Sequence, residues 1–208
     1  MNAIEAVVFD MDGVLIDATE WHYEALNDAL EIFGYEITRD EHSNKYNGLS
    51  TKKKLDILTE EKNFPKSLHK MIFEIKQDRT LRIAASKCFP QPAIQILLSR
   101  LRILNIKTAV VTNSISQTTN FMLTYSGIIN NFDFIITNED IKLPKPNPDG
   151  YQLALKKLGL NPENVLVLED GQYGIQAARS AGIENILEIK TISQVSIEQV
   201  SKFIPGLI

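Results

Sequence analysis

Apolar runs of strand length alternate with segments of helical periodicity along most of the chain, and this alternation constrains the fold most strongly. The predicted strands are short and largely β-branched, at residues 6–9, 108–111, 134–136, 164–168 and 185–189. The predicted helices between and after them lie at residues 94–104, 116–125, 148–158 and 174–181, with a short one in the tail. Such alternation is typical of parallel βαβ units. We therefore predict an α/β protein with a doubly wound, Rossmann-like parallel sheet.

The stretch between the first and second predicted strands has a different character. Residues 19–33 carry apolar side chains at helical spacing, and Gly34 is placed to end that helix. Residues 39–85 continue as polar, helix-compatible segments without a strong strand pattern. We expect an inserted helical domain at residues 17–86, and an α/β core domain formed by residues 1–16 and 87–208.

Composition excludes several classes of protein. The chain has 208 residues, with 22 Lys and Arg against 26 Asp and Glu, so its net charge of −4 argues against nucleic-acid binding. Its one cysteine, Cys88, excludes an intrachain disulfide. No signal-peptide pattern and no stretch long enough to cross a bilayer is present. We predict a cytoplasmic protein with no membrane association and no evident obligate protein partner.

Polar residues follow several of the predicted strands directly. Asp10 and Asp12 come after the first strand, Thr112 after the second and Asp170 after the fourth. In open α/β sheets, ligands bind beyond the carboxyl ends of the strands, where these residues are expected to meet. The pattern predicts a functional site at that edge of the sheet.

The residue types at this edge favour Mg²⁺ and phosphate chemistry. Mg²⁺ prefers oxygen ligands, which Asp10 and Asp170 can supply, and no His/Cys cluster indicates another metal. Asp10 is then placed to attack a bound phosphorus atom. Lys145, in a loop stiffened by three prolines at residues 143–148, is the candidate phosphate-binding cation, and Thr112 can donate its hydroxyl.

Asp12 lies two residues beyond Asp10, on the same side of an extended chain, and can act as general acid and base.

Each of these assignments has a plainer alternative. The Asp10–Gly13 stretch can be an ordinary turn, Thr112 a helix cap, Asp170 part of a polar turn and Lys145 a solvated loop charge. It is their joint occurrence in this order that favours a site.

Four motifs resemble those of the haloacid dehalogenase superfamily, in the subgroup that includes β-phosphoglucomutase and phosphoglycolate phosphatase. The motifs span residues 9–182 and read FDMDGVLID, VVTNS, LPKPNPDGY and VLEDGQYGIQAARSAG. The resemblance implies Asp10 as nucleophile, Asp12 as acid and base, Thr112 and Lys145 on phosphate, and Asp170 as a metal ligand. It also implies that the backbone carbonyl of Asp12 binds Mg²⁺ and that the helical insertion is a cap that shuts over the core.

The resemblance extends to substrate-binding candidates. They are Asn113 beside Thr112, His22 near the entrance, and Lys52 and Lys76 in the expected cap. For His22, a packed helix histidine is an equal alternative.

Two residues depart from the subgroup's pattern. Gly171 stands where the fourth motif usually has serine, which leaves the backbone for metal binding. Thr51 stands where the mutases carry an arginine that binds a second phosphate. Lys52, Lys54 or Lys76 would have to replace that arginine.

These patterns predict a Mg²⁺-dependent phosphatase that acts on a small phosphorylated metabolite, with sugar phosphates among the candidates. A phosphomutase of the β-phosphoglucomutase type is the alternative, and Thr51 argues against it. A dehalogenase is a further alternative, and the presence of Asp12 and Asp170 argues against it, because an enzyme that attacks carbon does not need both residues. A non-catalytic binding role is disfavoured because every catalytic position of the motifs is filled.

Overall fold

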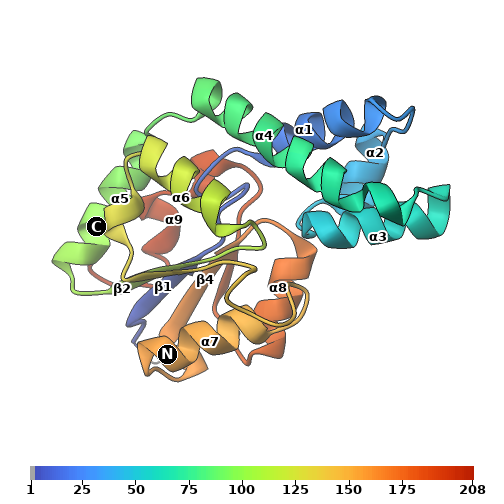
Figure 1. Ribbon diagram of the computed structural model, residues 1–208. Helices are drawn as coiled ribbons and strands as arrows, with labels where there is room; N and C mark the ends of the chain where they lie inside the picture. The colour runs from blue at the N-terminus through green and yellow to red at the C-terminus, as the bar shows by residue number, and fades with distance from the viewer. Residues whose placement is uncertain (1–2) are drawn as a thin grey trace.

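The computed structural model describes residues 3–208, within which five parallel strands form one sheet in the order β3-β2-β1-β4-β5 (Figure 1). The strands are β1 (Ala6–Phe9), β2 (Lys107–Val111), β3 (Phe134–Ile136), β4 (Val165–Glu169) and β5 (Ile186–Glu188). β1 lies at the centre, where Val8 is in register with Ala109 of β2 and Val167 of β4. The predicted α/β class and parallel sheet are confirmed.

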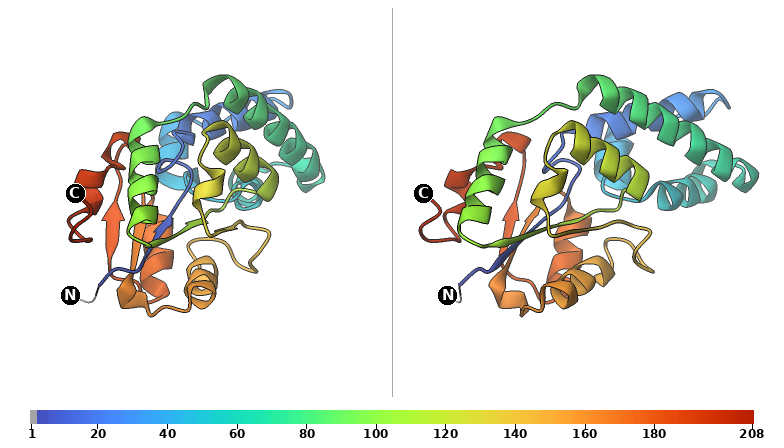
Figure 2. Two further views of the ribbon diagram at one scale, coloured as in Figure 1. Left: turned by 90° about the vertical axis from the view of Figure 1, so that its left-hand side faces the viewer. Right: turned by 60° about the vertical axis from the view of Figure 1, so that its left-hand side comes forward.

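Alternate residues of β1 enter two separate hydrophobic cores, because side chains point to opposite faces of a strand. Val7 and Phe9 pack in one core, and Ala6 and Val8 in the other. The first core is covered by α5 (Pro92–Ile103), α6 (Ser116–Tyr125) and α9 (Ile197–Val200), and the second by α7 (Asp149–Leu158) and α8 (Gln172–Ser180). Short 3-10 helices lie at Ile129–Asn131, Pro162–Asn164 and Ile192–Gln194. Figure 2 shows the sheet between these helices.

The remaining helices gather beyond the carboxyl ends of the strands (Figure 1). They are α1 (Thr19–Glu31), α2 (Arg39–Glu41), α3 (Thr51–Lys62) and α4 (His69–Lys87), with a π-helical turn at His42–Tyr46 and a 3-10 turn at Lys66–Leu68. They share a third hydrophobic cluster, which includes Leu26, Leu58 and Ile72. The division into two domains stays a prediction. Among residues 3–208, no helix has the length and apolar character needed to span a membrane.

Helix boundaries differ from the predicted ones where glycine changes the local backbone. α1 ends at Glu31, before the predicted end, and Gly34 with φ +74° donates its N–H to the Glu31 carbonyl. α8 begins at Gln172, because Gly171 takes an extended N-cap conformation. Gly174, expected to open this helix, therefore lies inside its first turn, facing the sheet.

The third cluster should contribute to stability in proportion to its buried area. Leu58 is fully buried there, so Leu58→Ala should lower the free energy of unfolding by about 2–5 kcal/mol. Met71 on α4 is 50% exposed, and Met71→Ala should change it by less than about 0.5 kcal/mol. Denaturant unfolding of both variants measures these changes. Equal losses of unfolding free energy in the two variants would contradict the burial of Leu58 in this cluster.

Candidate active site

A cavity of about 570 Å³ lies between the strand ends and the helices α3 and α4. Every site residue predicted from the sequence lines it: Asp10, Asp12, His22, Lys52, Lys76, Thr112, Asn113, Lys145 and Asp170. The topology explains the meeting, because β1, β2 and β4 are neighbours and parallel. The predicted gathering of polar residues at this edge is therefore found, while the role of each stays a prediction.

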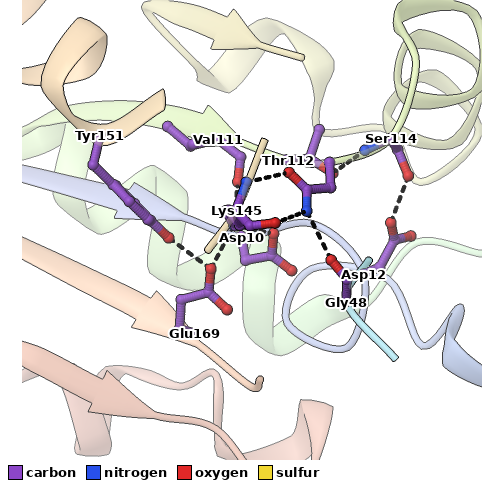
Figure 3. Close-up of polar contacts among 10 residues, drawn as sticks. Asp10, Asp12, Gly48, Val111, Thr112, Ser114, Lys145, Tyr151 and Glu169 are labelled. Carbon is purple, nitrogen blue, oxygen red and sulfur yellow. Dashed lines mark hydrogen bonds and ion pairs between the residues drawn. The ribbon is translucent and has the colours of Figure 1, made fainter. Parts of the chain in front are cut away.

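Lys145 is a buried charge of the cavity, with 6% of its surface exposed (Figure 3). Its Nζ donates to Asp10 Oδ1 at 2.6 Å and to the Val111 carbonyl at 2.8 Å, and it forms an ion pair with Glu169. Burial alone would lower the pKa of Lys145, but Asp10 and Glu169 raise it well above its ordinary value. The alternative of a solvated loop charge is wrong, since the ammonium is a fixed part of the site.

Glu169 is held in turn by Tyr151, a residue to which sequence reasoning gave no role. The fully buried Tyr151 hydroxyl donates to Glu169 Oε1 at 2.6 Å. Burial and the Glu169 charge raise the pKa of Tyr151 well above its ordinary value, so it stays a donor. Tyr151 is the last residue of the third motif, and only the fold shows that it contacts Glu169 of the fourth motif.

Gly174 makes room for this arrangement. A Cβ atom at Gly174 would overlap the Glu169 carboxyl group. The signal was present in the sequence, because a glycine within a helical pattern can mark a close approach. The glycine at the start of α8 thus lets Glu169 lie beneath the helix and reach Lys145.

Asp10 is buried and lies close to other carboxylates. Burial raises the pKa of Asp10 well above its ordinary value, Lys145 opposes this, and Glu169 and Asp170 add to it. Carboxylate oxygens of Asp10, Glu169 and Asp170 lie within 4.8 Å of one another. Such crowding of like charges is relieved when a cation binds among them.

These carboxylates fit a Mg²⁺ ion. Glu169 already accepts from Lys145 and Tyr151, which leaves Asp10 and Asp170 as the better ligands. Burial and the Glu169 charge raise the pKa of Asp170 to about 7, and a divalent cation would lower it. Gly13, with φ +89°, lets the backbone approach Asp170, since a Cβ there would lie only 2.7 Å from its Cγ. The role of the Asp12 carbonyl stays a prediction.

Asp12 is oriented by two side chains. The Ser114 hydroxyl donates to Asp12 Oδ2 at 2.7 Å, and His22 Nε2 lies 3.0 Å from Asp12 Oδ1 without the angles of a hydrogen bond. Burial favours the neutral acid, yet His22 and Ser114 lower the pKa of Asp12 overall. Ser114 stands in the second motif, but sequence reasoning did not link it to Asp12.

His22 is connected to a second cation. Lys76 Nζ lies 3.1 Å from His22 Nδ1, and an ammonium can only donate, so we assign the ring proton to Nε2, which faces Asp12. Burial and the charge of Lys76 lower the pKa of His22, which keeps the ring neutral. His22 therefore contacts both Lys76 and Asp12, and its part in a reaction stays a prediction.

The other predicted residues differ in how they face the cavity. The buried Thr112 hydroxyl accepts from the Ser114 N–H at 3.0 Å and remains free to donate. The Asn113 amide donates to the Gly48 carbonyl at 2.8 Å and its oxygen accepts from the Lys145 N–H, so it joins the helical segment to the Lys145 loop. Lys52 is exposed at the rim.

Comparison with known proteins confirms the resemblance to the haloacid dehalogenase superfamily. A sequence model described as "Haloacid dehalogenase-like hydrolase" matches residues 7–187. A Thermotoga maritima protein named phosphorylated carbohydrates phosphatase is 32% identical, over 88% of this chain and 84% of its own. The fructose-1-phosphate phosphatase of Escherichia coli is 28% identical, over 86% of this chain and 94% of its own. The crystal structure of β-phosphoglucomutase from Clostridium difficile superposes with a TM-score of 0.81 at 26% identity, covering 96% of each chain.

The close approach at Gly174 predicts that alanine is tolerated much less well there than at Gly171, three residues earlier. Gly174→Ala should lower the free energy of unfolding by about 1–3 kcal/mol, because the methyl group overlaps Glu169. Gly171→Ala should change it by less than about 0.5 kcal/mol, because no atom lies within 4 Å of a Cβ there. Chemical denaturation measures both, and an unaffected Gly174→Ala protein would contradict the described position of Glu169.

Proposed function

Because the chain belongs to the haloacid dehalogenase-like hydrolase family, we propose that it is a Mg²⁺-dependent phosphatase that hydrolyses a small phosphorylated metabolite through an aspartyl-phosphate on Asp10. The observation that carries the proposal is the buried Lys145 ammonium, fixed between Asp10 and Glu169 in the cavity that Asp170 also lines. Two relatives are named for phosphorylated carbohydrates and fructose 1-phosphate, which supports a sugar phosphate as substrate.

The first step transfers the phosphoryl group to the protein. An oxygen of Asp10 attacks phosphorus while the bond from phosphorus to the substrate oxygen breaks, and Asp12 gives its proton to that leaving oxygen. Lys145 orients the Asp10 carboxylate and offers positive charge to the phosphate, and the Thr112 hydroxyl can donate to it. Mg²⁺ held by Asp10 and Asp170 would supply the remaining charge neutralisation.

The second step returns Asp10 to its starting form. Asp12, now ionised, takes a proton from a water molecule, which attacks phosphorus and breaks the bond to Asp10. The lowered pKa of Asp12 favours this base form. For the first step Asp12 must hold a proton, and an arriving phosphate dianion favours that form through its negative charge. Ser114 and His22 keep the carboxyl group aimed at the cavity in both steps.

The helices of residues 17–86 would act as a cap that excludes bulk water and selects the substrate. Polar contacts between the segments support this. The Asn113 amide donates to the Gly48 carbonyl at 2.8 Å, the Thr118 hydroxyl to Gln77 Oε1 at 3.0 Å, and the Tyr173 hydroxyl to the Lys45 carbonyl at 3.4 Å. In this proposal the core supplies the reacting groups, and the cap supplies Lys54 and Lys76 to the same cavity.

A phosphomutase is the second candidate, favoured by the overall likeness to a β-phosphoglucomutase structure. Such an enzyme would pass the phosphoryl group to another hydroxyl of the sugar instead of to water. Thr51, which lines the cavity, carries no charge to hold a second phosphate. Assays that measure isomerised sugar phosphate and free phosphate in the same sample separate the two reactions.

Asp10→Asn should abolish turnover, because an amide cannot form the aspartyl-phosphate. Phosphate release from a panel of phosphorylated metabolites with Mg²⁺ should fall more than about 10³-fold, while the fold stays intact by circular dichroism. The matched control is Asp28→Asn, an exposed carboxylate on α1, which should behave like the unmodified protein. Turnover by Asp10→Asn near that of the control would rule out the nucleophile.

Asp170→Asn should raise the Mg²⁺ concentration needed for half-maximal activity by about tenfold or more, because one charged metal ligand is lost. A Mg²⁺ titration of phosphate release measures this, again with Asp28→Asn as control. An unchanged Mg²⁺ requirement would remove Asp170 from the metal site.

A further inference from the structure

The helical segment of residues 17–86 contacts the core in two different ways. On one side α4 packs against α6 (Figure 1), and there the buried Thr118 hydroxyl donates to the buried Gln77 side chain at 3.0 Å. At the rim of the cavity, two core side chains instead donate hydrogen bonds to the main chain of residues 45–48. Local opening is easiest where few buried contacts must break. The rim is therefore the place where the helical segment can separate from the core.

The two donors at the rim come from different strand ends. Asn113, which follows β2, donates from its amide to the Gly48 carbonyl at 2.8 Å. Tyr173, in the first turn of α8, donates from its hydroxyl to the Lys45 carbonyl at 3.4 Å. The Tyr173 ring also lies against Gly48, because a Cβ atom at Gly48 would be 3.8 Å from Cδ2 of the ring. One short stretch of main chain is thus held at both of its ends.

This stretch is firmly connected to the rest of the helical segment. The Asn47 N–H donates to the His42 carbonyl at 2.8 Å, and the Lys45 side chain forms an ion pair with Glu61 on α3. Residues 45–48 lead directly into α3, whose first turn lines the cavity. Contacts that hold this stretch therefore also hold one wall of the cavity in place.

Asn113 is bonded to the main chain of Lys145 as well. Its Oδ1 accepts from the Lys145 N–H at 3.0 Å, and its Nδ2 donates to the Lys145 carbonyl at 3.2 Å. A side-chain amide has two N–H donors, and here the carbonyls of Gly48 and Lys145 are their acceptors. This use of the amide suits a residue that positions two main-chain segments better than one that binds the substrate.

We propose that Asn113 and Tyr173 are positioning residues that form a latch, which holds residues 45–48 over the cavity, and that Asn113 joins this latch to the main chain of Lys145. The effect on turnover rests on the proposed function. The latch would retain the substrate while Asp10 reacts, and would open to release the products. Among residues 3–208, the lining of the cavity does not include Tyr173, so its effect would pass through residues 45–48.

Hydrogen exchange without substrate tests the latch whether or not the proposed reaction occurs. In Tyr173→Ala and in Asn113→Ala, the amides of residues 45–50 should exchange about threefold or more faster than in the unmodified protein. The matched control is Tyr125→Ala, because Tyr125 is 49% exposed at the end of α6, and this variant should leave that exchange unchanged. Unchanged exchange of residues 45–50 in either latch variant would overturn the proposal.

The same measurement separates the two roles of Asn113. In Asn113→Ala, the peptide of residues 143–147 should also exchange faster, because the Lys145 N–H loses its acceptor. In Tyr173→Ala, only residues 45–50 should change. Unchanged exchange of residues 143–147 in Asn113→Ala would remove the link between the latch and Lys145.

Steady-state phosphate release with Mg²⁺ tests the effect on turnover. Tyr173→Ala should raise KM about threefold or more, because fewer molecules hold the closed form, while kcat should stay within about twofold or rise. Asn113→Ala should raise KM and also lower kcat, because Lys145 loses its support. An unchanged KM in Tyr173→Ala would overturn the role of the latch in turnover. If the unmodified protein releases no phosphate from any metabolite, the proposed function fails, and hydrogen exchange alone decides the latch.

Discussion

The site depends on one buried cation, the ammonium of Lys145. It holds Asp10 and Glu169, two carboxylates that would otherwise repel each other in a place with little water. Tyr151 and Gly174 fix Glu169, and Glu169 helps to fix Lys145. Loss of the cation would leave buried negative charges unpaired, so the position of the reacting carboxylate and the stability of the strand ends rest on the same contact.

The fold divides the charges of the cavity between its two parts. The core contributes carboxylates at the ends of β1 and β4, together with Lys145. The helices beyond the strand ends contribute His22, Lys54 and Lys76.

The sequence was sufficient to predict the α/β class, all strands and the meeting of Asp10, Asp12, Thr112, Lys145 and Asp170, because parallel strands bring their carboxyl ends to one edge. It was not sufficient for the residues that hold them. Ser114 and Tyr151 act through contacts that join distant segments, which local patterns do not encode. In the run of residues 52–54, only the helix orientation shows that Lys54 is buried while Lys52 is exposed.

In the proposed reaction, Asp10 carries the phosphoryl group during turnover. This is measured by rapid acid quenching during turnover of a sugar phosphate with Mg²⁺, followed by digestion and mass spectrometry of the peptide that contains Asp10. We expect a peptide heavier by one phosphoryl group, with the modification on Asp10. Phosphate release without any modified peptide, or with the phosphoryl group on another residue, would contradict it.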